Sequence, residues 1–283
     1  MTDQPRGLSV RCEGIVHLYP GNGQEMDSVV ALRGVDLAVD AGEFVALLGP
    51  SGSGKSTVLG LLAGVLRPSA GRVLIGDHDI SHLPARALAR LRGSLVATVL
   101  QSPSRNVLPY ATVLENLRFA AQANRDRTRA EDVLHELELS ELAGQRAGRL
   151  SGGEQQRVAI AAAMCGGARL LLADEPTSQM DVVGRDEIID LLHRVNAQFG
   201  VTVVVVTHDA QIARQSGRTV TIRDGRIGAE GVEGREFAVV ARDGSLQLPP
   251  DIRERFGAGT MLEVTARGDD DINLRRRRPG GAS

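Results

Sequence analysis

The stretch Gly49-Pro-Ser-Gly-Ser-Gly-Lys-Ser-Thr57 decides the fold of this 283-residue chain. It matches the pattern G-x-x-x-x-G-K-[ST], in which the backbone N–H groups of a glycine-rich loop surround phosphate oxygens. The apolar run Glu43–Leu48 before it predicts a buried strand, and the apolar spacing after it predicts a helix over Lys55–Leu66. In this context Lys55 would reach the β- and γ-phosphates of a nucleotide, and the Ser56 hydroxyl would bind Mg²⁺.

The composition of the chain excludes several classes of protein. A hydrophobic share of 42% and a charged share of 24% are typical of a globular protein, and a net charge of −2 argues against a nucleic-acid coat protein. No apolar run reaches the roughly 18 residues of a membrane span, and the N-terminus lacks the apolar stretch of a secretory signal. Cys12 and Cys165 suggest reduced thiols in a cytoplasmic protein, and we expect no zinc site. Of the 33 basic residues only Lys55 is a lysine.

Short apolar runs alternate with helical patterns over roughly the first two hundred residues. This alternation predicts an α/β fold, with a largely parallel sheet that is covered by helices on both faces. Two alternating segments within Val10–Val39 predict an antiparallel edge, and the composition of Arg105–Gly148 predicts a helical insertion. Further strands are expected at Leu95–Leu100, Leu170–Ala173, Val201–Val206 and Thr219–Ile222, and a helix at Asp181–Phe199.

Two acids follow the apolar strand in Leu170-Leu-Leu-Ala-Asp-Glu-Pro-Thr177. A strand that ends at the carboxyl edge of a parallel sheet delivers its last side chains to the ligand crevice. There Asp174 can hold Mg²⁺, and Glu175 can polarise the attacking water in phosphoryl transfer. The alternative is a solvated acidic turn after a core strand. Gln101 and His208 also follow apolar runs, and a single polar residue at such a position is more often structural or solvated than catalytic.

The segment Leu150-Ser-Gly-Gly-Glu-Gln-Gln-Arg157 begins a helix. Ser151 is a good N-cap, and Glu154, three residues later, completes the sequence of a capping box. The other interpretation is that the same helix N-terminus binds a γ-phosphate. Both interpretations use the same N–H groups, so the sequence leaves both open.

Together these motifs resemble those of the ATP-binding subunits of ABC transporters. They occur in order over roughly residues 8–230. Three stretches are similar in amino-acid sequence to the lipoprotein-release and macrolide-export branch of the family: Val29–Leu37, Leu108–Leu117 and the Leu170–Thr177 strand. The motifs are a Walker A loop (Gly49–Thr57), a Q-loop (Gln101), a signature (Leu150–Arg157), a Walker B strand (Leu170–Thr177), a D-loop (Ser178–Asp181) and a switch histidine (His208).

The resemblance implies roles for individual residues. Tyr19 would stack on adenine, Glu175 would be the general base, and His208 would hold the γ-phosphate end of the site. The expected phosphate cradle is Gly49, Pro50, Ser51, Gly52, Ser53, Gly54, Lys55, Ser56 and Thr57, with Gln101 and His208 beside it. The expected metal ligands are Ser56, Gln101 and Asp174, and the expected catalytic residues are Glu175, His208 and Gln101. The expected contacts to ATP on a second subunit are Ser151, Gly152, Gly153, Glu154 and Asp181.

The resemblance also implies a mechanism and partners. The expected enzyme is an ATPase that uses ATP and Mg²⁺ and energises a separate membrane permease, which exports a lipid-linked, peptide or drug-like substrate. It would be a head-to-tail homodimer with two ATP molecules in its interface, peripheral on the cytoplasmic face of the membrane, and would pass its motion to the permease near Gln101–Tyr110. Two alternatives are a signalling module that operates a membrane regulator without transport, and a nucleotide-dependent DNA-binding regulator.

The chain changes character in its C-terminal part. We expect an ATP-binding domain over residues 1–232, with a helical subdomain at 105–165, a small domain at 235–266 and a disordered basic tail at 267–283. Glu236–Gly257 predicts a strand, a turn, a strand and a Pro-started helical turn, and a strand follows at Met261–Thr265. This order resembles the swapped-hairpin (AbrB-like) fold. From Arg235 onward the chain has nine arginines and eight acidic residues, so this part is nearly neutral. Because a nucleic-acid-binding segment is strongly basic, we expect an extra dimer contact through 236–266 rather than nucleic-acid binding.

Overall fold

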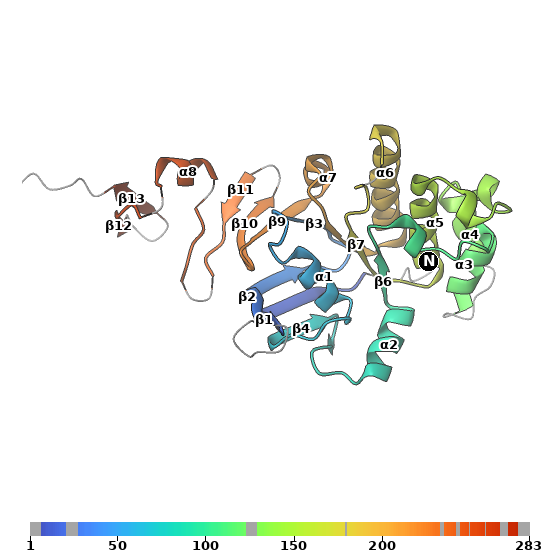
Figure 1. Ribbon diagram of the computed structural model, residues 1–283, viewed down its shortest axis with the longest axis horizontal. Helices are drawn as coiled ribbons and strands as arrows, with labels where there is room; N and C mark the ends of the chain where they lie inside the picture. The colour runs from blue at the N-terminus through green and yellow to red at the C-terminus, as the bar shows by residue number, and fades with distance from the viewer. Residues whose placement is uncertain are drawn as a thin grey trace, which may run out of the picture.

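The computed structural model describes residues 7–20, 28–122, 129–178, 180–232, 235–241, 244–248, 250–257, 259–266 and 271–276. A central sheet has the strand order β11-β10-β9-β3-β8-β7-β6, in which β9, β3, β8, β7 and β6 are parallel (Figure 1). The strands are β3 (Phe44–Leu48), β6 (Val96–Val99), β7 (Leu170–Asp174), β8 (Thr202–Val206), β9 (Arg218–Arg223), β10 (Arg226–Val232) and β11 (Arg235–Ala238). The predicted α/β class with a largely parallel sheet is confirmed.

The two antiparallel strands predicted within Val10–Val39 are present and pair with each other, but they belong to a separate sheet. The segments within Val10–Val39 are not an edge of the central sheet, because they form a second sheet with the order β2-β1-β4-β5. The antiparallel edge of the central sheet is instead β10 and β11, which include the glycine-rich stretch after residue 227. The second sheet consists of β1 (Val10–Tyr19), β2 (Val29–Val39), β4 (Ala70–Ile75) and β5 (His78–Asp79).

The central sheet buries a different core on each face. Along β8, Val204 and Val206 pack with α1 and the second sheet, whereas Val203 and Val205 pack with α5 and α6 on the opposite face. This follows from the alternation of side chains along a strand, and it explains why β8 reads as a continuous apolar run. The helices are α1 (Lys55–Leu62), α2 (Ala85–Ser94), α3 (Val113–Ala121), α4 (Arg129–Glu136), α5 (Gly152–Cys165), α6 (Val182–Phe199), α7 (Ala210–Gln215) and α8 (Pro250–Arg255).

A helical subdomain projects from one end of the molecule. Helices α3, α4 and α5 pack together there, and the chain between them makes short 3-10 turns at Pro103–Arg105, Ser140–Leu142 and Ala147–Arg149 (Figure 1). The predicted helical insertion is therefore confirmed. Across the described ranges, no helix combines the length and the apolar character that a membrane crossing requires.

The C-terminal part differs from the prediction in two ways. The first strand of the expected small domain, β11, pairs with β10 and so forms the edge of the central sheet. Within the expected tail, β13 (Ile272–Arg276) pairs with β12 (Leu262–Ala266), and the Arg276 guanidinium lies 5.8 Å from the centre of the Phe256 ring. Strand pairing and this ring contact order a segment whose charge indicated a solvated tail. The rest of the expected tail, 267–270 and 277–283, lies outside the described residues.

Thr202 offers a test of how the N-terminal segment is held. This residue is fully buried, and its Oγ1 donates to the Leu8 carbonyl at 2.7 Å and accepts from the Gly42 N–H at 2.8 Å. Thr202→Val keeps the shape but leaves two buried groups unpaired, so we expect the free energy of unfolding to fall by about 1–3 kcal/mol. Denaturant titration measures this. The control Thr98→Val, at an exposed position of β6, should change the value by less than about 0.5 kcal/mol.

Candidate functional site

A cleft of about 560 Å³ lies between the glycine-rich loop, β2 and the ends of central strands. It joins residues that are far apart in sequence, because neighbouring parallel strands end at the same edge of a sheet. The predicted site residues at the ends of three strands all reach this cleft: Gln101 after β6, Asp174 and Glu175 at the end of β7, and His208 after β8. The lining residues are Tyr19, Val29, Val30, Ala31, Ser51, Gly52, Gly54, Lys55, Ser56, Thr57, Gln101, Asp174, Glu175 and His208.

The loop between β3 and α1 passes close to other backbone segments. Gly49 has a φ of 148°, and a Cβ there would lie 2.1 Å from the Ile222 carbonyl oxygen. Gly54 has a φ of 106°, and a Cβ there would lie 2.7 Å from Leu32 Cδ2. Both positions therefore require glycine for two reasons, the positive φ and the lack of space for any side chain.

Lys55 is buried in the loop that precedes it. Its Nζ donates to the carbonyl oxygens of Gly49 and Pro50, at 2.8 and 2.9 Å. A compact ammonium can turn from one acceptor to another within such a small space, whereas a planar guanidinium has a fixed donor geometry. The loop thus holds one positive charge directly beside the start of α1.

Ser56 and Asp174 form an oxygen-rich corner of the cleft. The Ser56 hydroxyl donates to Asp174 Oδ1 at 3.5 Å. Burial and the neighbouring Glu175 carboxylate raise the pKa of Asp174, and the Ser56 hydroxyl and the Lys55 charge act in the opposite direction. A hydroxyl and a carboxylate are donors that suit Mg²⁺, which binds few protein ligands and keeps waters and substrate phosphates. The described residues at this corner therefore fit the metal that the sequence predicted.

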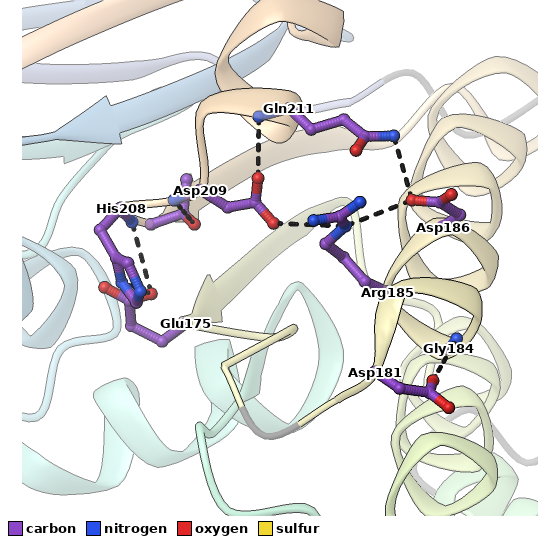
Figure 2. A network of polar contacts seen from close by, with 9 residues as sticks. Glu175, Asp181, Gly184, Arg185, Asp186, His208, Asp209 and Gln211 are labelled. Carbon is purple, nitrogen blue, oxygen red and sulfur yellow. Dashed lines mark hydrogen bonds and ion pairs between the residues drawn. The ribbon is translucent and has the colours of Figure 1, made fainter.

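Glu175 and His208, which both line the cleft, contact each other (Figure 2). Glu175 Oε2 lies 2.7 Å from His208 Nδ1 and accepts from the His208 backbone N–H at 3.4 Å. Glu175 has a φ of 47°, which is uncommon for a residue other than glycine and costs about 1–3 kcal/mol. Its own N–H donates to the Val206 carbonyl at 2.8 Å, so β8 fixes the backbone in this strained turn.

Tyr19 stands at the mouth of the cleft. Two contacts hold its side chain. The centres of the Tyr19 and His17 rings lie 4.7 Å apart in an edge-to-face arrangement, and the Tyr19 hydroxyl lies 3.2 Å from Thr57 Oγ1. His17 itself is buried, and its Nδ1 lies 2.9 Å from the Arg67 carbonyl oxygen. Tyr19 is 40% exposed and lines the cleft beside the phosphate loop.

The start of α5 has the capping box that the sequence predicted. The Glu154 N–H donates to Ser151 Oγ at 3.3 Å, and the Ser151 N–H donates to Glu154 Oε2 at 2.8 Å. Ser151 and Gly152 are exposed, and the stretch Ser151–Glu154 is absent from the described lining of the cleft. Asp181 is likewise an exposed N-cap, of α6, and its neighbour Gln179 lies outside the described residues.

Two groups of residues at the site were missed by the sequence analysis. Val29, Val30 and Ala31 of β2 line the cleft, and Val29 is 65% exposed opposite Tyr19 in the register. The sequence carried no signal for this group, because the pairing of Val29 with Tyr19 depends on the register of β1 and β2.

The second missed group ties the predicted Q-loop to α5. The fully buried Gln156 accepts from Asn106 Nδ2 at 3.0 Å and donates to the Leu100 carbonyl at 3.3 Å. Asn106 in turn bonds both backbone groups of Leu100, at 2.9 Å each. Gln101 follows directly, so its place at the cleft depends on these two amide side chains. Asn106 lies outside every predicted motif, and Gln156 lies in the signature, but its buried contact to Leu100 was not predicted.

Comparison with known proteins agrees with this geometry. Residues 32–178 match the model of the ABC transporter family. The chain belongs to this family. It is therefore an ATP-binding and ATP-hydrolysing domain of the ABC type, a class that uses ATP with Mg²⁺, and the predicted P-loop fold is confirmed.

The chain is similar in sequence or structure to individual members of this family. It is 44% identical over 213 residues to the lipoprotein-releasing system ATP-binding protein LolD of Anaeromyxobacter dehalogenans, covering 73% of this chain and 88% of that protein. It is 41% identical over 226 residues to the macrolide export ATP-binding/permease protein MacB 1/2 of Paracoccus denitrificans, covering 78% of this chain but 33% of that longer protein. Among solved structures, the dimeric ATP-binding cassette MJ0796 bound to ADP and Pi superposes with a TM-score of 0.70 at 34% identity, covering 81% of this chain and 100% of that one.

Lys55→Arg tests whether the phosphate loop needs an ammonium group. Because the guanidinium is planar and larger, we expect steady-state ATP hydrolysis to fall by roughly a hundredfold or more. Phosphate release measures this. The reciprocal exchange Arg90→Lys, at an exposed position of α2, is the matched control and should leave hydrolysis unchanged. Near-normal turnover of Lys55→Arg would contradict the assignment of Lys55 to the phosphates.

Proposed function

We propose that this chain is the ATP-hydrolysing subunit of an exporter and drives a separate membrane permease. One observation carries the proposal: the cleft joins the phosphate loop to Gln101, Glu175 and His208. The relatives named for lipoprotein release and macrolide export support a lipid-linked, peptide or drug-like cargo for the permease. The chain would then lie on the cytoplasmic face of the membrane, attached through that partner.

Glu175 is proposed as the general base of hydrolysis. Its Oε2 takes the proton as the attacking water adds to the γ-phosphorus, and His208 holds this carboxylate through its backbone N–H and Nδ1. When ATP is bound, the contact between the two side chains would rearrange so that His208 reaches the γ-phosphate. The strained backbone of Glu175 keeps the carboxylate directed into the cleft.

The phosphates and the metal would occupy the other half of the cleft. Lys55 would exchange its bonds to the Gly49 and Pro50 carbonyls for bonds to the β- and γ-phosphates. Ser56, Asp174 and Gln101 would hold Mg²⁺, which neutralises the charge that develops on the phosphates during transfer. The ring of Tyr19 would carry the adenine.

A homodimer is proposed as the active form. The cassette MJ0796 was solved as a dimer, and this chain covers all of it. Ser151, Gly152, Gly153 and Glu154 stand at a helix N-terminus outside the cleft of their own chain, which supports a contact to ATP held by a second subunit. Asp181 would join the same interface.

The permease is proposed to dock beside the Q-loop. Tyr110 is 74% exposed there, and the amide pair Asn106–Gln156 connects this region to α5. A movement of Gln101 toward bound Mg²⁺ would therefore shift both the docking surface and the start of α5.

Glu175→Gln tests the proposed base. The amide is nearly isosteric but cannot accept the proton, so ATP should still bind while hydrolysis falls by roughly a hundredfold or more. The variant should then accumulate as an ATP-dependent dimer, which size-exclusion chromatography with and without ATP detects. Full hydrolysis by this variant would contradict the assignment of the base.

We further propose that the C-terminal segment, with its AbrB-like order of elements, adds a second dimer contact. Within the part of the chain that the structure describes, the β12–β13 sheet has two strands, and a two-stranded sheet is marginally stable unless something packs on it. Val264 and Ile272, which are 64% and 68% exposed, give this sheet an apolar surface, and the nearly balanced charge after Arg235 does not favour DNA.

Val264→Asp in the full chain tests this contact. Without nucleotide, we expect the wild-type protein to dimerise with rising concentration and this variant to stay monomeric, as measured by sedimentation. Thr265→Asp, on the opposite face of β12, is the matched control and should still dimerise. Tight, salt-resistant binding of the wild-type chain to DNA in a gel-shift assay would instead support the nucleic-acid alternative.

A further inference from the structure

A closed circuit of polar contacts joins the starts of α6 and α7 (Figure 2). From α6, Arg185 Nε donates to Asp186 Oδ1 at 3.2 Å and lies 3.7 Å from Asp209 Oδ2. From the α7 side, Asp209 Oδ1 accepts from the Gln211 N–H at 2.8 Å, and Gln211 Nε2 donates to Asp186 Oδ1 at 3.0 Å. One guanidinium therefore stands between two carboxylates that belong to different helices.

The contact between Arg185 and Asp209 is partly shielded from water, whereas the Asp186 side chain is 46% exposed. The Arg185 side chain is 28% exposed and that of Asp209 is 16% exposed. Charges that are partly buried attract each other more strongly and are screened less by salt than fully exposed ones. The contact between Arg185 and Asp209 can thus hold the two helix starts in one arrangement.

On one side, the circuit leads to the catalytic carboxylate. Asp209 directly follows His208, and its N–H donates to Thr207 Oγ1 at 2.9 Å. The His208 N–H and ring then contact Glu175 Oε2. A shift of Asp209 therefore moves the backbone that orients Glu175.

On the other side, the circuit leads to the proposed dimer interface. The Arg185 N–H donates to the Asp181 carbonyl at 3.0 Å, and Asp181 Oδ1 accepts from the Gly184 N–H at 2.9 Å. Arg185 thus lies one helical turn after the residue that would face the second subunit.

We infer that Arg185 is a positioning residue, which couples the helix start at Asp181 to the placement of His208 against Glu175. Without the guanidinium, no positive charge separates the carboxylates of Asp186 and Asp209, and we expect their repulsion to move the start of α7 away from α6. The inference rests on the roles proposed above for Glu175 and His208. It adds a group that touches neither nucleotide nor metal and acts through its neighbours.

The test compares Arg185→Gln with Arg194→Gln in steady-state hydrolysis. Arg194 is the matched control, because it lies on the same helix and pairs with Glu138 at 3.0 Å, away from the cleft. We expect Arg185→Gln to lower kcat about tenfold, with KM changed by less than about twofold. Arg185→Lys, which keeps the positive charge, should recover most of kcat, and Arg194→Gln should behave like the wild type.

Two further measurements separate positioning from general stability. In a Glu175→Gln background, Arg185→Gln should leave the Kd of a fluorescent ATP analogue unchanged, and its Tm should match that of Arg194→Gln. Asp209→Asn keeps a good helix cap while removing the charge, so it should lower kcat like Arg185→Gln, and the double variant should fall no further than either single one.

The possible results distinguish the inference from the function on which it rests. A normal kcat for Arg185→Gln, beside an inactive Glu175→Gln, would overturn the inference alone. A loss of kcat that comes with weaker nucleotide binding, or with a Tm well below that of Arg194→Gln, would also overturn it, because the role would then be structural. Full hydrolysis by Glu175→Gln would remove the proposed base and the inference together.

Discussion

The close backbone contact around the phosphate loop is the constraint on which the rest of the site depends. Gly49 lies against the Ile222 carbonyl, and the Gly225 N–H donates to the Ser53 carbonyl at 3.1 Å. On the other side, the Arg33 N–H of β2 donates to the Gly225 carbonyl at 2.8 Å. Strands from both sheets therefore fix the loop, and neighbouring backbone groups occupy the space where side chains would be.

The edge of the parallel sheet provides the chemistry around this loop. Adjacent strands β8, β7 and β6 end beside one another and bring His208, Glu175 and Gln101 to a single cleft. Helices on the same face then hold these ends in place. The Asn106–Gln156 amides support the end of β6, and Arg185 supports the segment after β8. The residues proposed to act in hydrolysis and the residues that contact them thus come from different layers of the fold.

The expectations that succeeded were those with a strong local cause. The apolar runs of the central strands, the helix after the phosphate loop and the capping box at Ser151 follow from side-chain burial and from N–H groups at helix starts. Those that failed required knowledge of a partner strand. β11, which the sequence assigned to a small separate domain, joins the central sheet because β10 pairs with it. β13 is ordered because β12 pairs with it, although its sequence resembles a charged tail.

By itself, the sequence determined the phosphate loop, the strand that delivers Asp174 and Glu175, and the family of the protein, because each depends on a short run of residues whose geometry is local. The tertiary structure alone decided that Val29 lies opposite Tyr19, that Gln156 supports the Q-loop, and that one guanidinium joins α6 to the segment after His208. These contacts link residues distant in the chain, and no local pattern records them, because their energy comes from burial and pairing that exist only after the sheets and helices have packed.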